Sequence, residues 1–83
     1  MSKTQRLIEI DCNRDRRLEA AYPLPEQIRI LGQAILTGEK AELEKMLVFL
    51  AAVQTRAESL RAGVAAAGQG QKLPKADFSD IKK

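Results

Sequence analysis

The strongest constraint on the fold is a run of apolar residues that recurs in a heptad pattern between residues 43 and 67. Within this run, every position of the alternating three-and-four spacing is apolar. Such spacing places one apolar seam along a single α-helix, and the seam needs another helix to cover it. That helix belongs either to the same chain or to a second copy. The seam positions are Leu43, Met46, Leu50, Val53, Ala57, Leu60, Val64 and Ala67.

The length and composition of the chain favour one small helical domain. The chain has 83 residues, and aromatic residues make up only 4% of it. Residues 3–67 are dominated by good helix formers such as Ala, Leu, Glu, Lys, Arg and Gln, so we expect an all-α fold with an aliphatic core. The helical domain is predicted over residues 1–67. Alternating Gly and Gln at 68–71 predict a flexible linker, followed by a tail to residue 83.

Three helices are predicted within this domain, over residues 3–21, 25–36 and 39–66. Pro23 and Pro25 end the first helix, because proline lacks a backbone N–H and restricts the residue before it. Pro25 also suits the first turn of the second helix, and Gly38 suits the left-handed position that ends it. The short connection at Gly38 predicts that the second and third helices form an antiparallel hairpin.

The apolar stripe of the second helix is expected to lie inside this hairpin. We assign the stripe to Ile28, Leu31, Ile35 and Leu36, with the hairpin core near Leu50. The third helix is about 42 Å long at 1.5 Å per residue, so the second helix covers less than half of it. The first helix is too polar at its centre to cover the rest. We therefore expect the first helix and a second molecule to share the seam.

The end of the chain leaves two alternatives. Gly63 and the alanines that follow it predict fraying of the third helix. Beyond them, Phe78 and Ile81, preceded by Leu73, could form a short docking motif. The other interpretation is a disordered polar tail, which the composition favours.

The residue types argue against an enzyme. The chain has no histidine and a single cysteine, Cys12, so it lacks an ordinary general base near neutral pH and a Cys/His metal site. Glu39, Glu42 and Glu44 are explained by the favourable position of acids at a helix N-terminus. No glycine-rich phosphate loop is present. We therefore predict no catalytic residues, no cofactor and no metal, and we expect Cys12 to be a half-buried filler.

A nucleic-acid-binding or regulatory protein is the alternative function. The formal net charge is +3, and its most basic cluster consists of Arg14, Arg16 and Arg17. Asp15 interrupts this cluster, and other acids flank it at spacings that allow pairing on a helix. A phosphate-binding surface normally has basic residues without opposing acids. We therefore favour a solvated, self-paired face, and nucleic-acid contact through Arg14, Arg16 and Arg17 remains the alternative.

The segment that runs from this arginine cluster into the second helix also carries a family resemblance. Residues 14–18, 21–28 and Leu31 resemble small helical proteins encoded among the tail genes of bacteriophages and prophages, in which an arginine-rich helix precedes an aromatic-proline break. The resemblance implies a structural or assembly role in a virion, with no catalytic residues, and phage structural proteins as partners.

Taken together, these observations predict a non-enzymatic, self-associating protein of the host cytoplasm or virion. No signal peptide or membrane span is expected, because the longest apolar run is far shorter than the roughly 20 residues that a span needs. The expected interface of the homo-oligomer, or of a complex with another protein, is the seam of the third helix: Leu43, Met46, Leu50, Val53, Ala57, Leu60 and Val64.

Overall fold

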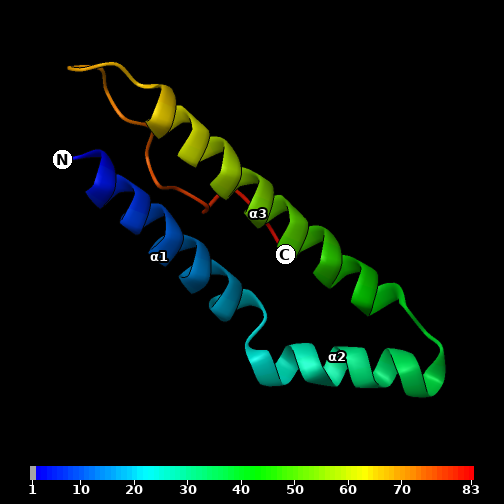
Figure 1. The fold of residues 1–83 in the computed structure, drawn as a ribbon. Helices are drawn as coiled ribbons and strands as arrows, with labels where there is room; N and C mark the ends of the chain where they lie inside the picture. Colours follow the sequence, from blue (N-terminus) through cyan, green and yellow to red (C-terminus); the bar gives the residue numbers. More distant parts are fainter. Residues whose placement is uncertain (1) are drawn as a thin grey trace.

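A computed structural model describes residues 2–83 of the protein. These residues form three α-helices and no strands: α1 (Lys3–Ala21), α2 (Leu24–Thr37) and α3 (Ala41–Ala66) (Figure 1). The predicted all-α fold is confirmed, and the first helix has the predicted bounds. The third helix begins at Ala41, two residues later than predicted, because its first helical hydrogen bond runs from the Glu44 N–H to the Lys40 carbonyl at 2.8 Å.

Local capping explains where the helices begin and end. Ser2 caps α1: its hydroxyl accepts from the Gln5 backbone N–H at 3.1 Å, and the Gln5 side chain accepts from the Ser2 N–H at 3.0 Å. This reciprocal arrangement satisfies two backbone groups that a helix N-terminus otherwise leaves unpaired. Gly38 ends α2 in the left-handed conformation with φ of 76°, as its place in the sequence predicts.

The main helix pair consists of α1 and α3, which run antiparallel and side by side (Figure 1). The molecule is elongated, with extents of 54 × 17 × 17 Å, and α2 extends from one end of this pair. The second and third helices, α2 and α3, are also in contact, as predicted. The largest helix interface, however, joins the first and third helices.

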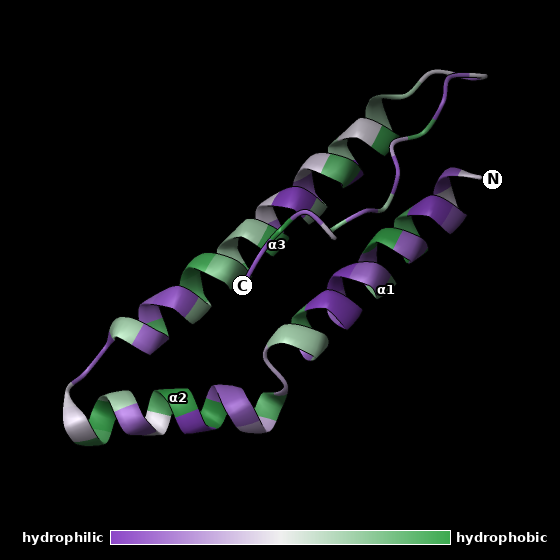
Figure 2. Ribbon diagram, turned by 180° about the vertical axis from the view of Figure 1, so that it is seen from behind, coloured by the Kyte–Doolittle hydropathy of each residue, from purple (hydrophilic) through white to green (hydrophobic). Residues whose placement is uncertain are grey.

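The chain after α3 has neither helix nor strand and folds back across the α1–α3 pair (Figure 2). Ala76 and Phe78 are buried there, with 8% and 4% of their surface exposed. Leu73 and Ile81 pack against the same core as partly buried residues. The expectation of a disordered tail therefore does not hold for this segment. Phe78 and Ile81 instead pack against the helices, as the alternative of a docking motif predicts.

A single apolar core joins all four parts of the chain. The Tyr22 and Phe49 rings lie at its end near α2, with centroids 5.5 Å apart and planes inclined at 59°. Both rings are almost completely buried, so the few aromatic residues are concentrated inside the molecule. The buried core residues are Ile10, Ala21, Tyr22, Ile30, Met46, Phe49, Val53, Ala57, Val64, Ala76 and Phe78.

Candidate interaction surface

The seam of α3 lies mostly inside the single chain. Met46 is 2% exposed, and Val53, Ala57 and Val64 have no exposed surface. Leu43, Leu50 and Leu60 are partly buried and pack against the same core. These residues are therefore not free to form the intermolecular interface that their heptad spacing predicts. The seam does need a partner, and the same chain supplies it.

The C-terminal tail supplies the cover that α1 alone lacks. Besides its buried apolar side chains, its backbone carbonyls accept hydrogen bonds from α1: Pro74 from the Arg6 guanidinium at 2.5 Å and Ala76 from the Asn13 amide at 2.8 Å. These bonds replace the backbone pairing that an extended segment would otherwise find in a sheet. Polar residues in the first turn and near the centre of α1 thus hold the tail in place.

The tail is also bound from the side of α3. The two terminal guanidinium nitrogens of Arg56 donate to the Asp80 carboxylate, at 2.8 and 2.7 Å. The hydrogen bond from Arg56 lowers the pKa of Asp80 below its ordinary value, and it raises the pKa of Arg56. Pro74 passes close to Gly63, where an added Cβ would lie 3.2 Å from the proline Cγ. Gly63 therefore lies inside α3 at a close approach of the tail, not at a frayed helix end.

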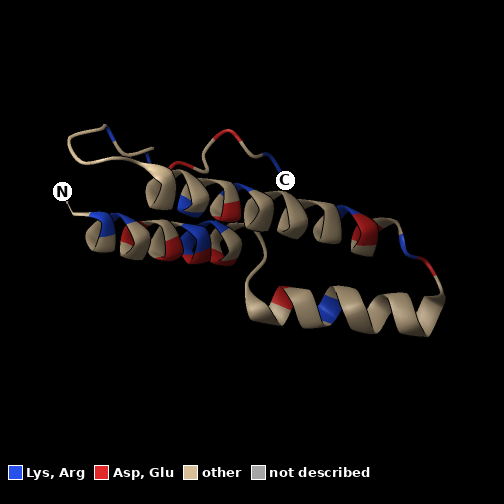
Figure 3. Cartoon of the chain, turned by 45° about the horizontal axis from the view of Figure 1, so that its top comes forward, with Lys and Arg blue, Asp and Glu red and all other residues tan. Residues whose placement is uncertain are grey.

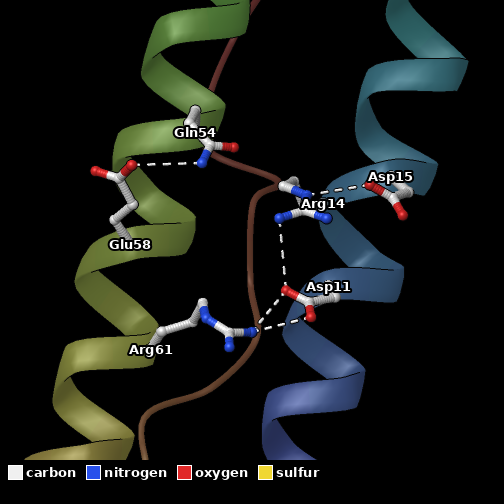
Figure 4. Close-up of polar contacts among 6 residues, drawn as sticks. All are labelled: Asp11, Arg14, Asp15, Gln54, Glu58 and Arg61. Carbon is white, nitrogen blue, oxygen red and sulfur yellow. Dashed lines mark hydrogen bonds and ion pairs between the residues drawn. The ribbon is translucent and has the colours of Figure 1, made fainter.

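The arginine cluster of α1 does not form a free basic surface. Arg14 pairs with Asp11 at 3.5 Å and with Asp15 at 3.1 Å, and Asp11 also pairs with Arg61 of α3 at 2.8 Å (Figure 4). This network joins the two long helices. The self-pairing expected of this helix face is observed for Arg14, and it extends through Asp11 to Arg61 of α3.

The other two arginines of the cluster have different environments. Arg17 donates to the Ile81 carbonyl, and its guanidinium carbon lies 5.3 Å from the centroid of the Phe49 ring. Its side chain is therefore part of the contact between α1, α3 and the tail. Arg16 is exposed and forms no ion pair within the described residues 2–83. Only one of the three arginines remains available to a phosphate backbone.

The side of α2 that faces away from α3 exposes several large aliphatic residues. Ile30 and Ala34 face the molecule and are 2% and 7% exposed, so the predicted inward stripe is wrong. The five residues on the other side are exposed by 44% to 87%. We call these the α2 outer face: Leu24, Ile28, Leu31, Ile35 and Leu36.

The rotation of α2 that exposes this face is held by polar contacts. The Gln27 amide donates to the Tyr22 carbonyl at 2.8 Å, and Arg29 bonds Glu42 of α3 at 2.7 Å and Gln33 at 3.1 Å. Arg29 also bonds Glu26, which lowers the pKa of that carboxyl. The short connections on both sides of α2 leave little freedom to turn the helix. Its more hydrophobic side therefore faces outward.

Few charges accompany the exposed apolar residues of α2. Charged residues are interspersed along α1, whereas Glu26 and Arg29 are the only charged residues of α2 (Figure 3). Glu26 lies away from the outer face, whereas Arg29 lies at its edge beside Leu36, because residues seven apart fall on the same side of a helix. Arg29 is paired there with Glu26 and Glu42. Gly32 lies beside the face, and nothing within 4 Å would touch a Cβ added there. A groove on this side of α2 is lined by Ile28, Arg29, Gly32, Gln33, Leu36 and Thr37.

Other kinds of site are not built by the described residues. Among residues 2–83, no group of three or more Cys, Asp or Glu side chains is placed to hold a metal ion. Cys12 is exposed, contrary to the expected half-buried position. None of the three helices combines the length and hydrophobicity that crossing a membrane requires.

Comparison with protein-family models, curated proteins and solved structures finds no match to this chain.

Proposed function

We propose that this chain is a non-enzymatic structural or assembly protein that binds its protein partner through the α2 outer face. The observation that carries the proposal is the exposure of five large aliphatic side chains on one helix, with Ile35 82% and Leu36 87% exposed. Contiguous exposed apolar surfaces of this kind are typical of interaction sites. The resemblance of residues 14–18, 21–28 and Leu31 to phage tail-region proteins supports a setting in a phage or prophage particle assembled in the host cytoplasm.

The size of the face is sufficient for a reversible interaction. A Leu or Ile side chain contributes about 1.5–3 kcal/mol when fully buried, so covering these five at their present exposures contributes about 5–10 kcal/mol. That corresponds to roughly 200–400 Å² of apolar surface. Association itself costs about 4–15 kcal/mol in lost freedom. The face therefore suits a partner that adds further contacts around it, as the subunits of an assembled particle do.

Site-specific photo-crosslinking tests this proposal. A photoreactive residue in place of Ile35 should crosslink to protein in the cells that naturally make the chain. The same residue in place of Ala52, which is exposed on α3, provides the control for an exposed helical position outside the face. A product at position 35 that is absent at position 52 is the expected result. Equal or absent products at both positions would refute the assignment of the α2 outer face.

A further inference from the structure

We infer that the partner covering the α2 outer face is a second copy of this chain, with the two α2 helices packed antiparallel about a twofold axis. This inference rests on the proposed function, since it names the partner of the same face. The outer-face residues Leu24, Ile28, Leu31 and Ile35 follow one another at spacings of four, three and four. This is the heptad spacing of a helix that packs along a narrow seam.

The face is complementary to itself in the antiparallel orientation. When Leu24 lies opposite Ile35 of the other copy, Ile28 lies opposite the other copy's Leu31, and the twofold axis repeats both pairs. Every seam residue then meets an aliphatic side chain. The antiparallel arrangement also places the helix dipoles in favourable opposition. A twofold interface requires this kind of self-complementarity, because each copy offers the same surface.

The residues beside the seam permit close approach of a second copy. In this heptad register, the positions flanking the seam are Pro25, Gln27, Gly32 and Ala34, none of which is charged. The nearest charged residue, Arg29, lines the groove at Gly32, but it is paired with Glu26 and Glu42 of its own chain. Two copies therefore bury no unpaired charge. At Gly32 no side chain separates the helix backbones, and the groove there has room for a side chain of the other copy.

The area available predicts a weak dimer. Covering the face on both copies buries roughly 400–800 Å² of apolar surface, which implies a total interface of roughly 700–1,300 Å² at the usual apolar share. Stable interfaces bury about 1,200–2,000 Å². The dimer is therefore expected to dissociate on dilution, with a dissociation constant on the order of micromolar or weaker.

Disulfide pairing between two variants tests both the partner and its orientation. Leu24→Cys and Ile35→Cys are made as separate full-length chains in a Cys12→Ser background and mixed under mild oxidation. We expect the mixed disulfide between positions 24 and 35 to exceed either homodisulfide at least several-fold. Val48→Cys, 70% exposed on α3, is the control for random collision. Unchanged far-ultraviolet circular dichroism shows that each variant is folded.

Two results would overturn the inference. Homodisulfides at positions 24 and 35 in place of the mixed product would mean that the helices pair in parallel. The second result has two parts: the disulfide yields do not exceed that of the Val48→Cys control, and the unmodified protein has a light-scattering mass of 9.2 kDa at millimolar concentration. Both together would mean that no second copy binds. In that second case, a photo-crosslink from position 35 to a different protein would still uphold the proposed function.

Discussion

Replacing Phe78 with alanine should destabilise the protein by about 3–4 kcal/mol, because a buried phenylalanine truncated to alanine typically costs 3–5 kcal/mol. Phe78 is only 4% exposed and lies in the cluster that contains the α3 seam. We place the effect in the lower part of the range because the tail has no regular structure and can shift to fill some of the space. The loss would be a large fraction of the roughly 5–15 kcal/mol that holds a typical domain folded.

Chemical and thermal denaturation measure this effect. For a domain of this size, 1 kcal/mol shifts the melting temperature by about 4–8 °C, so the midpoint should fall by roughly 12–30 °C. Phe78→Leu is the matched control, since it keeps most of the apolar volume and should lose about 1–1.5 kcal/mol. All three proteins are compared at one concentration, because dimerisation also affects the midpoint. A loss below about 0.5 kcal/mol for Phe78→Ala, the range typical of surface substitutions, would refute the docked position of the tail.

Single substitutions in the helices and in the tail should each change the stability of the fold in a defined direction. Leu60→Asp should cost about 2–4 kcal/mol by disrupting the packing of α3 within its own chain, seen as a lower denaturation midpoint; unchanged stability would place Leu60 outside the core. Gly38→Ala should lower the free energy of unfolding by about 1–2 kcal/mol, because φ of 76° is unfavourable for a residue with a Cβ. A denaturation midpoint equal to that of the unmodified protein would contradict this conformation. Arg17→Ala should lower the free energy of unfolding by about 1–3 kcal/mol, because it removes a charged hydrogen bond to the tail. Arg16 is exposed, so Arg16→Ala should change that free energy by less than about 0.5 kcal/mol. Equal effects of the two substitutions would argue against the structural role of Arg17. Because the Arg56 hydrogen bond lowers the folded pKa of Asp80 below its ordinary value of 3.8, this pair stabilises the fold above that pH and ceases to do so as the pH falls through the folded pKa. Asp80→Asn should therefore lose less stability than the unmodified protein when the melting temperature is followed into acid, and an equal loss would contradict the ion pair.

Local sequence signals predicted the helices well because they act within a few residues. Pro23 and Pro25 cannot continue a helix, and Gly38 adopts the left-handed conformation without strain, so these residues fix the breaks whatever the tertiary packing. The heptad run of α3 also predicted that its seam would be covered. The pattern could not show whether the cover came from the same chain, since both arrangements need the same apolar residues.

The position of the tail was harder to predict because its composition is mostly polar. Phe78 alone gives little indication of burial, and the groups that bind the tail are arginines and an asparagine of distant helices, such as Asn13. A sequence pattern does not report such long-range hydrogen bonds. The burial of the seam within one chain followed from the same contacts, because Ala76 and Phe78 supply apolar area that α1 lacks.

The rotation of α2 could not be derived from its own hydrophobicity. The helix has apolar residues on two sides, and the more hydrophobic side would be expected to face inward. The contacts of Gln27 and Arg29 with neighbouring segments, together with the turns on either side of the helix, place Ile30 and Ala34 inside instead. A conflict between local pattern and tertiary structure of this kind is expected at a functional surface.

The solution mass of an outer-face variant tests whether the chain associates through α2, as we propose, and not through the α3 seam. Light scattering across a wide concentration range would compare the unmodified protein with Ile35→Glu and with the exposed α3 control Ala52→Glu. We predict that the unmodified protein and the control approach twice 9.2 kDa as concentration rises, while Ile35→Glu stays at the mass of one chain with unchanged helicity. Dimerisation of Ile35→Glu to the same extent as the control would contradict the claim.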